Sequence, residues 1–343
     1  MNIEPIRAIR DSVNILPQSL SGYTCVENKS QYPPIKFYTG GFCYSVMLRN
    51  QNNHTLCFRI WLDNEICAKN KEHVLRVSNY LKYNKLTYTI PYSYYESALR
   101  IPKHNITIPA VVMEWVDGIT LIEYIKQNYR NSALVQKLAR NFYAMIEDMR
   151  RRGIAHGDLS GDNIMVRGDG SLCLIDYDSF YVAEWGNLKQ PLSGIKCYQH
   201  PGRKYNVYLN KSIDNFSAQV IYLSLLVISS KSNLFNPNID KGSGLLFQEQ
   251  DIDSASSLER SQIYREILNI NNSEIQFRAK VLLKSLKYRF EDVESICDCE
   301  TVEKEKIIFT PIFKANYCGE CGNKFASEEE LYCPRCGKKR MSL

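Results

Sequence analysis

The sequence His156-Gly157-Asp158-Leu159-Ser160-Gly161-Asp162-Asn163 is followed a short distance later by Leu174-Ile175-Asp176-Tyr177-Asp178. The first stretch sets a carboxylate, Asp158, before an amide, Asn163, and the second adds the carboxylate of Asp176 after an apolar run. Carboxylate and amide oxygens are ligands that Mg²⁺ accepts, and a carboxylate beside a hydroxyl group can orient it or take its proton. These three residues therefore guide the interpretation of the whole chain.

Phosphoryl transfer is the chemistry that these side chains suit, because it needs positioned charges and metal ligands more than covalent catalysis. We expect Asp158 to accept or orient the proton of an attacking hydroxyl, Asn163 to bind magnesium through its amide oxygen, and Asp176 to bridge magnesium to the phosphates of ATP. Either fragment alone is more simply explained as a solvated turn or a strand-end aspartate. The two fragments together, at this spacing, favour the site.

The segments on either side of the loop support this interpretation. Residues 132–152 have apolar side chains at helical spacing and lead directly into the loop. Apolar runs at 163–166 and 172–175 are joined by a turn that contains glycine, which predicts a hairpin. Such a hairpin would bring Asn163 and Asp176 close together.

The composition limits the broad class of the protein. A chain of 343 residues, 44% hydrophobic and 23% charged, is typical of a soluble globular protein with more than one structural unit. The net charge of +6 is small and does not single out nucleic acid as a partner. No secretory signal is visible, and the longest apolar stretch, 220–228, is too short to cross a bilayer. The twelve cysteines without an export signal predict reduced thiols, a cytoplasmic location and no membrane attachment.

Strand-like segments precede helix-like segments along the chain. Strands are expected at 37–48, around a glycine turn, and at 54–61 and 108–116, with a helix at 69–83. Further helices are expected at 121–128, 220–228, 262–268 and 274–286, and loops with short ordered pieces at 229–257. The pattern predicts an α+β fold in which a small antiparallel sheet lobe gives way to a mostly helical lobe near residues 115–118.

In this order the segments resemble the protein-kinase-like superfamily over residues 36–296, in particular its bacterial-type, atypical Ser/Thr kinases. Residues 156–163 are similar to the catalytic loop, and Asp176-Tyr177-Asp178 stands where Asp-Phe-Gly is expected. Tyr198-Gln199-His200-Pro201 resembles the end of the activation segment. Asp214 is similar to the aspartate that begins the large central helix and braces the backbone of the catalytic loop.

Several positions in the sheet lobe depart from the usual kinase pattern. The resemblance makes Gly40 and Gly41 the turn that approaches the phosphates, although a third glycine is missing. Arg59 stands where a lysine usually contacts the phosphates, and its expected partner on the following helix is Glu72, with Glu65 a weaker choice. The alternatives are an ordinary hairpin turn for the glycines and a solvent-exposed strand arginine for Arg59.

Further departures lie in the catalytic loop. Gly157 replaces the arginine that usually precedes the catalytic aspartate, which argues against control by a phosphate on the activation segment. Ser160 replaces a lysine usual in protein Ser/Thr kinases, and His-Gly-Asp is common in aminoglycoside-phosphotransferase-like kinases. His156 and Tyr177 occupy positions that stack in an internal column between the lobes, and Asp162 is expected in a surface turn.

A second metal signal lies near the end of the chain. Two Cys-x-x-Cys pairs, each followed by glycine, are separated by eleven residues and consist of Cys318, Cys321, Cys333 and Cys336. Four thiolates form a closed tetrahedral zinc site, which is structural because no position stays open for a substrate. The pattern resembles a zinc ribbon, a module that would dock protein or nucleic acid. Redox-active or unpaired thiols are the alternative.

The resemblance implies a bilobal protein-kinase-like fold with a small zinc-ribbon module. Its expected regions are an N-terminal extension at 1–35, an N-lobe at 36–116, a C-lobe at 117–296, a linker at 297–314 and the ribbon at 315–343. ATP, Mg²⁺ and a structural Zn²⁺ are the implied cofactors. The hinge, Met113-Glu114-Trp115-Val116, would hold adenine through the backbone of Glu114 and Val116.

Three functions follow from this interpretation. The first is an ATP- and Mg²⁺-dependent phosphotransferase acting on protein Ser/Thr, with the ribbon for docking. The second is a small-molecule kinase of the aminoglycoside-phosphotransferase type, which His-Gly-Asp and Ser160 allow. The third is a nucleotide-binding pseudokinase adaptor, which Arg59 and the sparse glycines favour.

Overall fold

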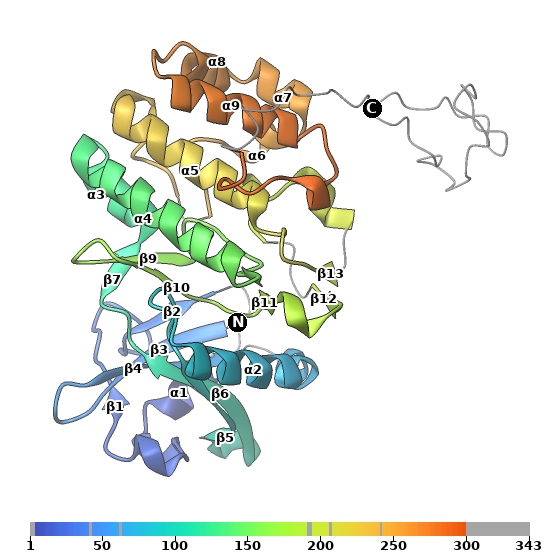
Figure 1. Cartoon of the computed structure of the whole chain (residues 1–343). Coiled ribbons are helices and arrows are strands. Elements are labelled where there is room, and N and C mark those ends of the chain that lie inside the picture. Colours follow the sequence, from blue (N-terminus) through green and yellow to red (C-terminus); the bar gives the residue numbers. More distant parts are fainter. Residues whose placement is uncertain are drawn as a thin grey trace, which may run out of the picture.

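Strands from the first part of the chain form one antiparallel sheet (Figure 1). The computed structural model describes residues 4–40, 43–61, 64–190, 194–205, 208–240 and 242–299, without the side chains of 64–69 and 204–205. The strands are β1 Thr24–Cys25, β2 Phe37–Thr39, β3 Cys43–Arg49, β4 Thr55–Trp61, β5 Tyr92–Ile101 and β6 Ile106–Glu114. Their order is β1-β3-β4-β6-β5, and β2 pairs with β3. This curled sheet accounts for the strand-rich first half of the sequence.

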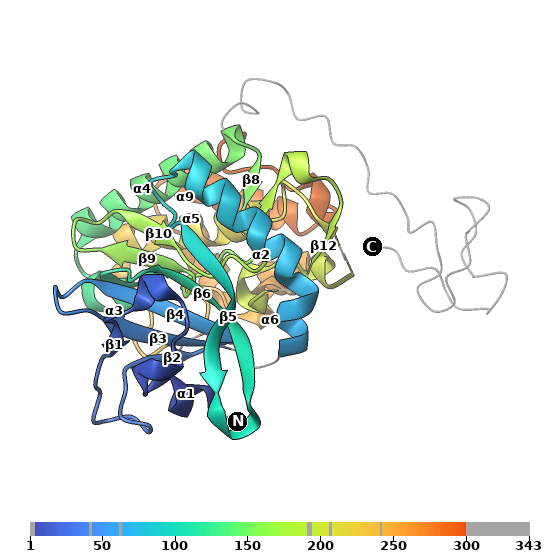
Figure 2. The ribbon, with the colours of Figure 1, turned by 90° about the horizontal axis from the view of Figure 1, so that it is seen from below.

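The two faces of the sheet are buried by different helices. Because side chains alternate along a strand, Val111 and Met113 of β6 join one hydrophobic cluster, whereas Ala110 and Val112 join another. The first cluster includes the apolar side of α2 Asn64–Asn84, which packs across β4, β5 and β6 (Figure 2). The second cluster includes α1 Glu4–Ile9, which packs against β5. The N-terminal segment is therefore part of the core of the sheet region.

The remaining helices stack beyond the sheet (Figure 1). They are α3 Leu121–Asn128, α4 Ser132–Arg151, α5 Asn215–Ser230, α6 Glu249–Ile252, α7 Ala255–Arg260, α8 Gln262–Leu268 and α9 Ser273–Ser285. Nearly every side chain of α5 is buried, and α5 packs against both α4 and α9. An apolar helix that is covered on all sides is the centre of a helical core, so α5 organises this region.

Short two- and three-stranded sheets connect the two regions. In the three-stranded sheet, β9 Ile164–Arg167 lies between β7 Gly118–Thr120 and β10 Leu172–Leu174. The pairing sets Ile164 opposite Leu174 and Val166 opposite Leu172, so the buried side chains share one face. Two further pairs are β8 Ile154–Ala155 with β11 Tyr181–Val182, and β12 Leu188–Lys189 with β13 Tyr208–Leu209. The pairing of β8 with β11 and of β9 with β7 and β10 fixes the two ends of the loop that carries Asp158.

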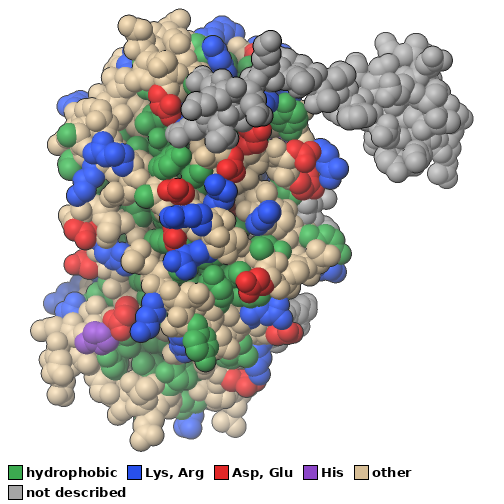
Figure 3. Space-filling view, viewed as in Figure 1, with side chains coloured by type: hydrophobic (Ala, Val, Ile, Leu, Met, Phe, Trp, Pro, Cys, Tyr) green, Lys and Arg blue, Asp and Glu red, His purple; other side chains and the backbone are tan. Residues whose placement is uncertain are grey.

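Short 3-10 helices complete the described structure. They are η1 Ser12–Asn14, η2 Gln18–Leu20, η3 Pro102–His104, η4 Ala183–Trp185, η5 Lys196–Tyr198, η6 Pro201–Tyr205, η7 Ser232–Leu234 and η8 Phe290–Asp292. Within the described ranges, no helix combines the length and the apolar character that a membrane crossing requires. On the face seen in Figure 3, acidic and basic side chains are interspersed over the helical region, in keeping with a small, distributed net charge.

This mixture of an antiparallel sheet and helices agrees with the α+β fold expected from the sequence. The helices at 121–128 and 262–268 have the predicted bounds, and the predicted hairpin is β9 with β10. Strand β5 is among the strands that were not predicted. Its alternation of exposed and buried residues is broken by a register shift between Tyr95 and Leu99, which obscures the period-two pattern in the sequence. The loop expected at 229–257 contains the short helices α6 and α7.

Candidate functional site

The loop from His156 to Asn163 runs between β8 and β9 and is held from below by Asp214 at the start of α5. The Asp214 carboxylate accepts hydrogen bonds from the backbone N–H of His156 and, at 3.0 Å and 3.2 Å, from that of Gly157. Asp214 is buried, so these bonds satisfy donors that water would not reach. This is the bracing contact that the resemblance implied for Asp214.

Gly157 is required by the path of the loop. Its φ is +78°, and a Cβ atom at this position would lie 2.1 Å from the carbonyl oxygen of Ser179. Only glycine avoids both the left-handed strain and the collision. The buried guanidinium of Arg203 donates to the Gly157 carbonyl and to Gln199 Oε1, and Arg203 Nε lies 3.1 Å from Gln190 Oε1. The loop is thus held from two sides.

Asp158 projects from the centre of this loop and is fixed by Asn163. The Asn163 amide nitrogen donates to the Asp158 carbonyl at 2.8 Å and to its Oδ2 at 3.1 Å. Because the nitrogen of the amide is used in this way, its oxygen is directed elsewhere. Burial raises the pKa of Asp158, and the nearby carboxylate of Asp176 adds to the rise. Asp158 is therefore an aspartate whose proton affinity is higher than usual.

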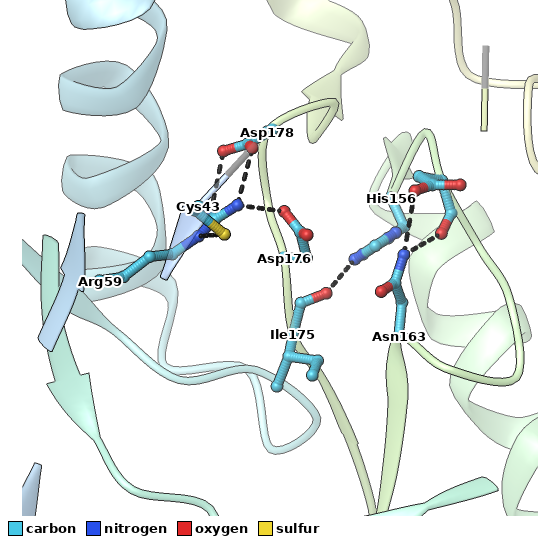
Figure 4. A network of polar contacts seen from close by, with 8 residues as sticks. Cys43, Arg59, His156, Asn163, Ile175, Asp176 and Asp178 are labelled. Carbon is cyan, nitrogen blue, oxygen red and sulfur yellow. Dashed lines mark hydrogen bonds and ion pairs between the residues drawn. The ribbon is translucent and has the colours of Figure 1, made fainter. Parts of the chain in front are cut away.

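Asp176 lies between Arg59 and Asn163 (Figure 4). The predicted hairpin brings it there, since the backbone N–H of Ile175 donates to the Asn163 carbonyl at 3.0 Å. Asp176 has a φ of +66°, an uncommon conformation for a residue other than glycine and one that recurs at functional sites. Its side chain is 39% exposed, so the carboxylate can be reached by a ligand.

Arg59 reaches this site from β4 and is not a solvent-exposed strand arginine. Its side chain is 9% exposed, and Nη2 lies 2.8 Å from Asp176 Oδ1 and 2.8 Å from Asp178 Oδ2. The second terminal nitrogen, Nη1, donates to Asp178 Oδ1 at 3.1 Å, and Nε donates to Cys43 Sγ at 3.1 Å. Burial lowers the pKa of Arg59, but the two carboxylates outweigh burial and hold that pKa well above its usual value. Arg59 is therefore charged.

The prediction that Arg59 pairs with Glu72 on α2 is wrong. Glu72 is 90% exposed and pairs with Arg76 at 3.3 Å, one helical turn away on the same helix. The described neighbour of Glu72 that points inward is His73, which is half-buried and stacks edge-on against Trp185. Burial lowers the pKa of His73 to about 4, so its ring is neutral and offers Arg59 no charge. The side chain of Glu65 lies outside the described residues.

His156 and Tyr177 pack in a column that joins the sheet region to the helical region. The ring of His156 meets Tyr177 edge-on at 6.1 Å, and Tyr177 stacks against Tyr92 of β5 at 6.0 Å. The Tyr177 hydroxyl accepts from the Ile90 N–H at 2.8 Å, and His156 Nε2 bonds to the Ile175 carbonyl at 2.9 Å. Both side chains are buried, which agrees with the packing role expected for them.

The predicted nucleotide contacts are only partly within the described residues. Gly40 is exposed at the tip of the β2–β3 hairpin, and its N–H donates to the Cys43 carbonyl at 2.8 Å. Gly41 lies outside the described residues. At the hinge, the Glu114 side chain bonds to His54 at 2.7 Å, and Val116 packs against the main hydrophobic cluster. The nucleotide contact expected for the backbone of Glu114 and Val116 stays a prediction.

The oxygen ligands at the site fit Mg²⁺ bound together with phosphate. Among the described residues, no group of three or more His, Cys, Asp or Glu side chains could hold a metal ion alone. Mg²⁺ keeps water and phosphate oxygens in its coordination shell and needs only one or two protein ligands. The amide oxygen of Asn163 and the carboxylate of Asp176 are ligands of the required type. The four cysteines of the predicted zinc site, Cys318, Cys321, Cys333 and Cys336, lie outside the described residues.

Sequence reasoning missed two residues of this site. Asp178 was noted only for the absence of glycine, although it has the larger share of the contacts with Arg59. Arg203 follows the activation-segment motif, and no sequence pattern links it to Gly157, from which it is separated by 46 positions. Asp162 is also not in a surface turn, because it is buried and its Oδ2 accepts from the Gly242 N–H at 2.7 Å.

Comparisons with known proteins point to the same part of the chain. Residues 92–181 match the ABC1 atypical kinase-like domain, a range that includes Asp158, Asn163 and Asp176. The CBL-interacting serine/threonine-protein kinase 21 of Arabidopsis thaliana is 26% identical over 117 residues, which are 34% of this chain and 28% of that protein. The mouse sperm motility kinase 2A is 29% identical over 115 residues, 33% of this chain and 19% of the relative. The matched part of the chain thus covers less than a third of either relative, and these matches support a kinase-like domain in this protein.

Proposed function

We propose that this chain is an ATP- and Mg²⁺-dependent phosphotransferase that transfers the γ-phosphate to serine or threonine of a protein substrate. The observation that carries the proposal is the arrangement of Asp158, Asn163 and Asp176. Asn163 holds the Asp158 carboxylate at 3.1 Å, while its backbone bonds at 3.0 Å to the residue before Asp176. The kinase-like match over 92–181 spans all three residues.

In this proposal Asp158 orients the hydroxyl of the substrate and takes up its proton as the new bond to phosphorus forms. A carboxylate whose pKa is raised by burial is a better proton acceptor than an exposed one. Asn163 and Asp176 would hold Mg²⁺, which neutralises charge on the phosphates when it is bound with ATP. Arg59 would contact the phosphates, the Gly40-Gly41 turn would lie above them, and the backbone of Glu114 and Val116 would hold adenine.

The proposal includes a zinc ribbon at 315–343 that docks a protein partner or substrate. Its support is the Cys-x-x-Cys spacing alone, since four thiolates in two such pairs favour a structural zinc. A module of this size has too little apolar surface to fold without the metal. We place the protein in the cytoplasm, where its thiols would stay reduced.

One contact favours a second candidate function, a nucleotide-binding pseudokinase adaptor. Arg59 lies 2.8 Å from an Asp176 oxygen, and a carboxylate that is bound to a guanidinium is less available to Mg²⁺. If this contact persisted with ATP bound, nucleotide would be held without transfer. The two candidates therefore differ in what happens to the γ-phosphate.

The test uses the full chain with γ-labelled ATP and Mg²⁺, together with a panel of protein substrates and, separately, an aminoglycoside. The proposal expects label on protein and, after acid hydrolysis, phosphoserine or phosphothreonine. Label on the aminoglycoside alone would favour the small-molecule kinase. Nucleotide binding without transfer to any acceptor would favour the adaptor.

A further inference from the structure

A buried arginine needs a counter-charge, because an unpaired cation in a protein interior costs several kcal/mol, on the order of the whole stability of many domains. Arg59 is such a residue, with 9% of its side chain exposed. The guanidinium also lies over the ring of Trp61, 5.9 Å from its centre, which fixes one face of the group. The carboxylate that neutralises Arg59 therefore decides where its nitrogens point.

The described side chains of α2 do not provide this carboxylate. Glu72 extends into solvent and pairs with Arg76, and His73 is neutral at physiological pH. The helix packs on the sheet through Val74, Val77 and Leu81, which are apolar. As far as the helix is described, its contribution near the site is packing rather than charge.

Asp178 does provide it, with the geometry that fixes a guanidinium in place. Its two oxygens contact the two terminal nitrogens of Arg59, Oδ1 with Nη1 at 3.1 Å and Oδ2 with Nη2 at 2.8 Å. Two parallel bonds between a carboxylate and an arginine set both the position and the plane of the guanidinium. Asp176 contacts Arg59 only through Nη2, a nitrogen that Asp178 also holds. Figure 4 shows both carboxylates around the end of the Arg59 side chain.

The backbone that carries Asp178 is fixed by its neighbours. Tyr177, before it, is 3% exposed within the aromatic column, and Ser179, after it, is 1% exposed. The Phe180 N–H donates to the Tyr177 carbonyl at 3.0 Å, which closes a turn around Asp178. A carboxylate on such a turn is oriented before any ligand arrives, so little ordering is needed when a phosphate binds.

We propose that Asp178 is a positioning residue for nucleotide binding: it holds Arg59 toward the phosphates in the role that a carboxylate on α2 would otherwise fill. This inference rests on the proposed function, in which Arg59 contacts the phosphates. Because Asp178 retains Arg59 through two bonds, Asp176 can exchange its single contact with Arg59 for another ligand without releasing the arginine. Asp178, which stands where glycine is usual, thus supplies a counter-charge for Arg59 that glycine could not provide.

The experiment is a double-mutant cycle in nucleotide affinity. The dissociation constant of a fluorescent N-methylanthraniloyl-ATP with Mg²⁺ is measured for the wild type, Asp178→Ala, Arg59→Ala and the double variant, and the thermal midpoint of each protein is recorded. We expect Asp178→Ala to weaken binding about tenfold, Arg59→Ala to weaken it at least as much, and the double variant to match Arg59→Ala. Asp178→Glu, which keeps the charge, is expected to recover part of the affinity.

Glu72→Gln is the matched control on α2 and is expected to bind as the wild type does. The inference is overturned if Asp178→Ala binds nucleotide as the wild type does, or if it weakens binding equally with and without Arg59. It is also overturned if Glu72→Gln or Glu65→Gln has an effect as large as Asp178→Ala. A wild type that binds no nucleotide would instead refute the proposed function, and the inference with it.

Discussion

The Asp214 carboxylate accepts two hydrogen bonds from the backbone N–H of Gly157, at 3.0 Å and 3.2 Å, across a sequence separation of 57 residues. The same carboxylate accepts a bond from the His156 N–H. One buried side chain at the start of α5 thus holds the backbone on which Asp158 is carried. The relationship links the helical core to the chemistry of the loop.

Asp214→Ala is expected to destabilise the protein and to reduce transfer. The substitution leaves two buried N–H groups without an acceptor, at about 1–3 kcal/mol each, or roughly 2–6 kcal/mol in total. Urea unfolding gives the change in the free energy of unfolding. Asp169→Ala is the control, because its carboxylate accepts the Ser171 N–H at 2.8 Å in an exposed turn, where water replaces the lost bond and a much smaller change is expected. Equal losses in the two variants would contradict the bracing role of Asp214.

Gly157→Ala is expected to be strongly destabilising. A left-handed conformation costs a residue with a Cβ about 1–2 kcal/mol, and the 2.1 Å approach to the Ser179 carbonyl adds about 1–3 kcal/mol of overpacking. The matched control is Gly168→Ala, where no heavy atom lies within 4 Å of the added Cβ. That variant is expected to stay within about 0.5 kcal/mol of the wild type by the same unfolding measurement. A Gly157→Ala protein as stable as the Gly168→Ala protein would show that Ser179 does not approach so closely.

Acid is expected to destabilise the protein through His200. Its Nδ1 accepts the Gly202 N–H at 3.0 Å and its Nε2 lies 3.2 Å from the Ser285 carbonyl, a pair of bonds that only the neutral ring can make. Burial accordingly lowers the pKa of His200. When the pKa of a histidine is lower in the folded than in the unfolded state, the unfolded state binds the proton first. The protein therefore loses stability as pH falls below about 6.5, the pKa of an unfolded-state histidine. By pH 5.5 the loss attributable to one such histidine is at most about 1.4 kcal/mol.

The measurement is the free energy of unfolding at pH 7.5 and at pH 5.5 for the wild type and for His200→Gln. The wild type is expected to lose more stability over this interval than the variant does. His73, whose pKa burial lowers to about 4, contributes to both proteins equally and cancels in the comparison. Identical losses in the two proteins would rule out His200 as an acid-sensitive group.

The proposed zinc ribbon predicts one tightly bound Zn²⁺ per chain. Cys318→Ser and Cys333→Ser each remove one of four thiolate ligands, so both variants are expected to lose the metal when the zinc content is measured by mass spectrometry. The control is Cys297→Ser, since Cys297 is a free thiol packed against the main hydrophobic cluster rather than part of a Cys-x-x-Cys pair. Nucleotide binding is expected to survive removal of zinc with a chelator. A wild-type protein without zinc would refute the ribbon.

The sequence was sufficient for the loop and hairpin because their signals are local. The apolar runs beside Asn163 and Asp176 are short and continuous, as in buried strands, and the turn between them contains glycines that permit it. The same holds for helices such as 121–128, where Thr120 caps the Glu123 N–H at 3.3 Å.

The rest depends on contacts between distant residues. Arg59 and Asp178 are 119 positions apart, and Arg203 and Gly157 are 46 positions apart. Neither contact produces a periodic pattern in the sequence. Glu72 was the predicted partner of Arg59 because it lies on the next helix. The rotation of α2, which is set by the packing of Val74, Val77 and Leu81, turns Glu72 toward solvent. A single sequence does not define the rotation of a helix precisely enough to show whether one given residue faces the site or solvent.

The most direct test of the central claim compares the wild type with Asp158→Asn under γ-labelled ATP and Mg²⁺, with nucleotide binding and thermal midpoint measured on the same preparations. The variant is expected to transfer about 10² to 10⁴ times more slowly, because the proton acceptor is removed, while it binds nucleotide as before. Since burial raises the pKa of Asp158, its ionised form is unfavourable in the fold, and the neutral amide is expected to leave the thermal midpoint unchanged or higher. Transfer by the wild type and its loss in a folded, nucleotide-binding Asp158→Asn protein is the predicted result. Nucleotide binding with no transfer by either protein, or equal transfer by both, would contradict the account.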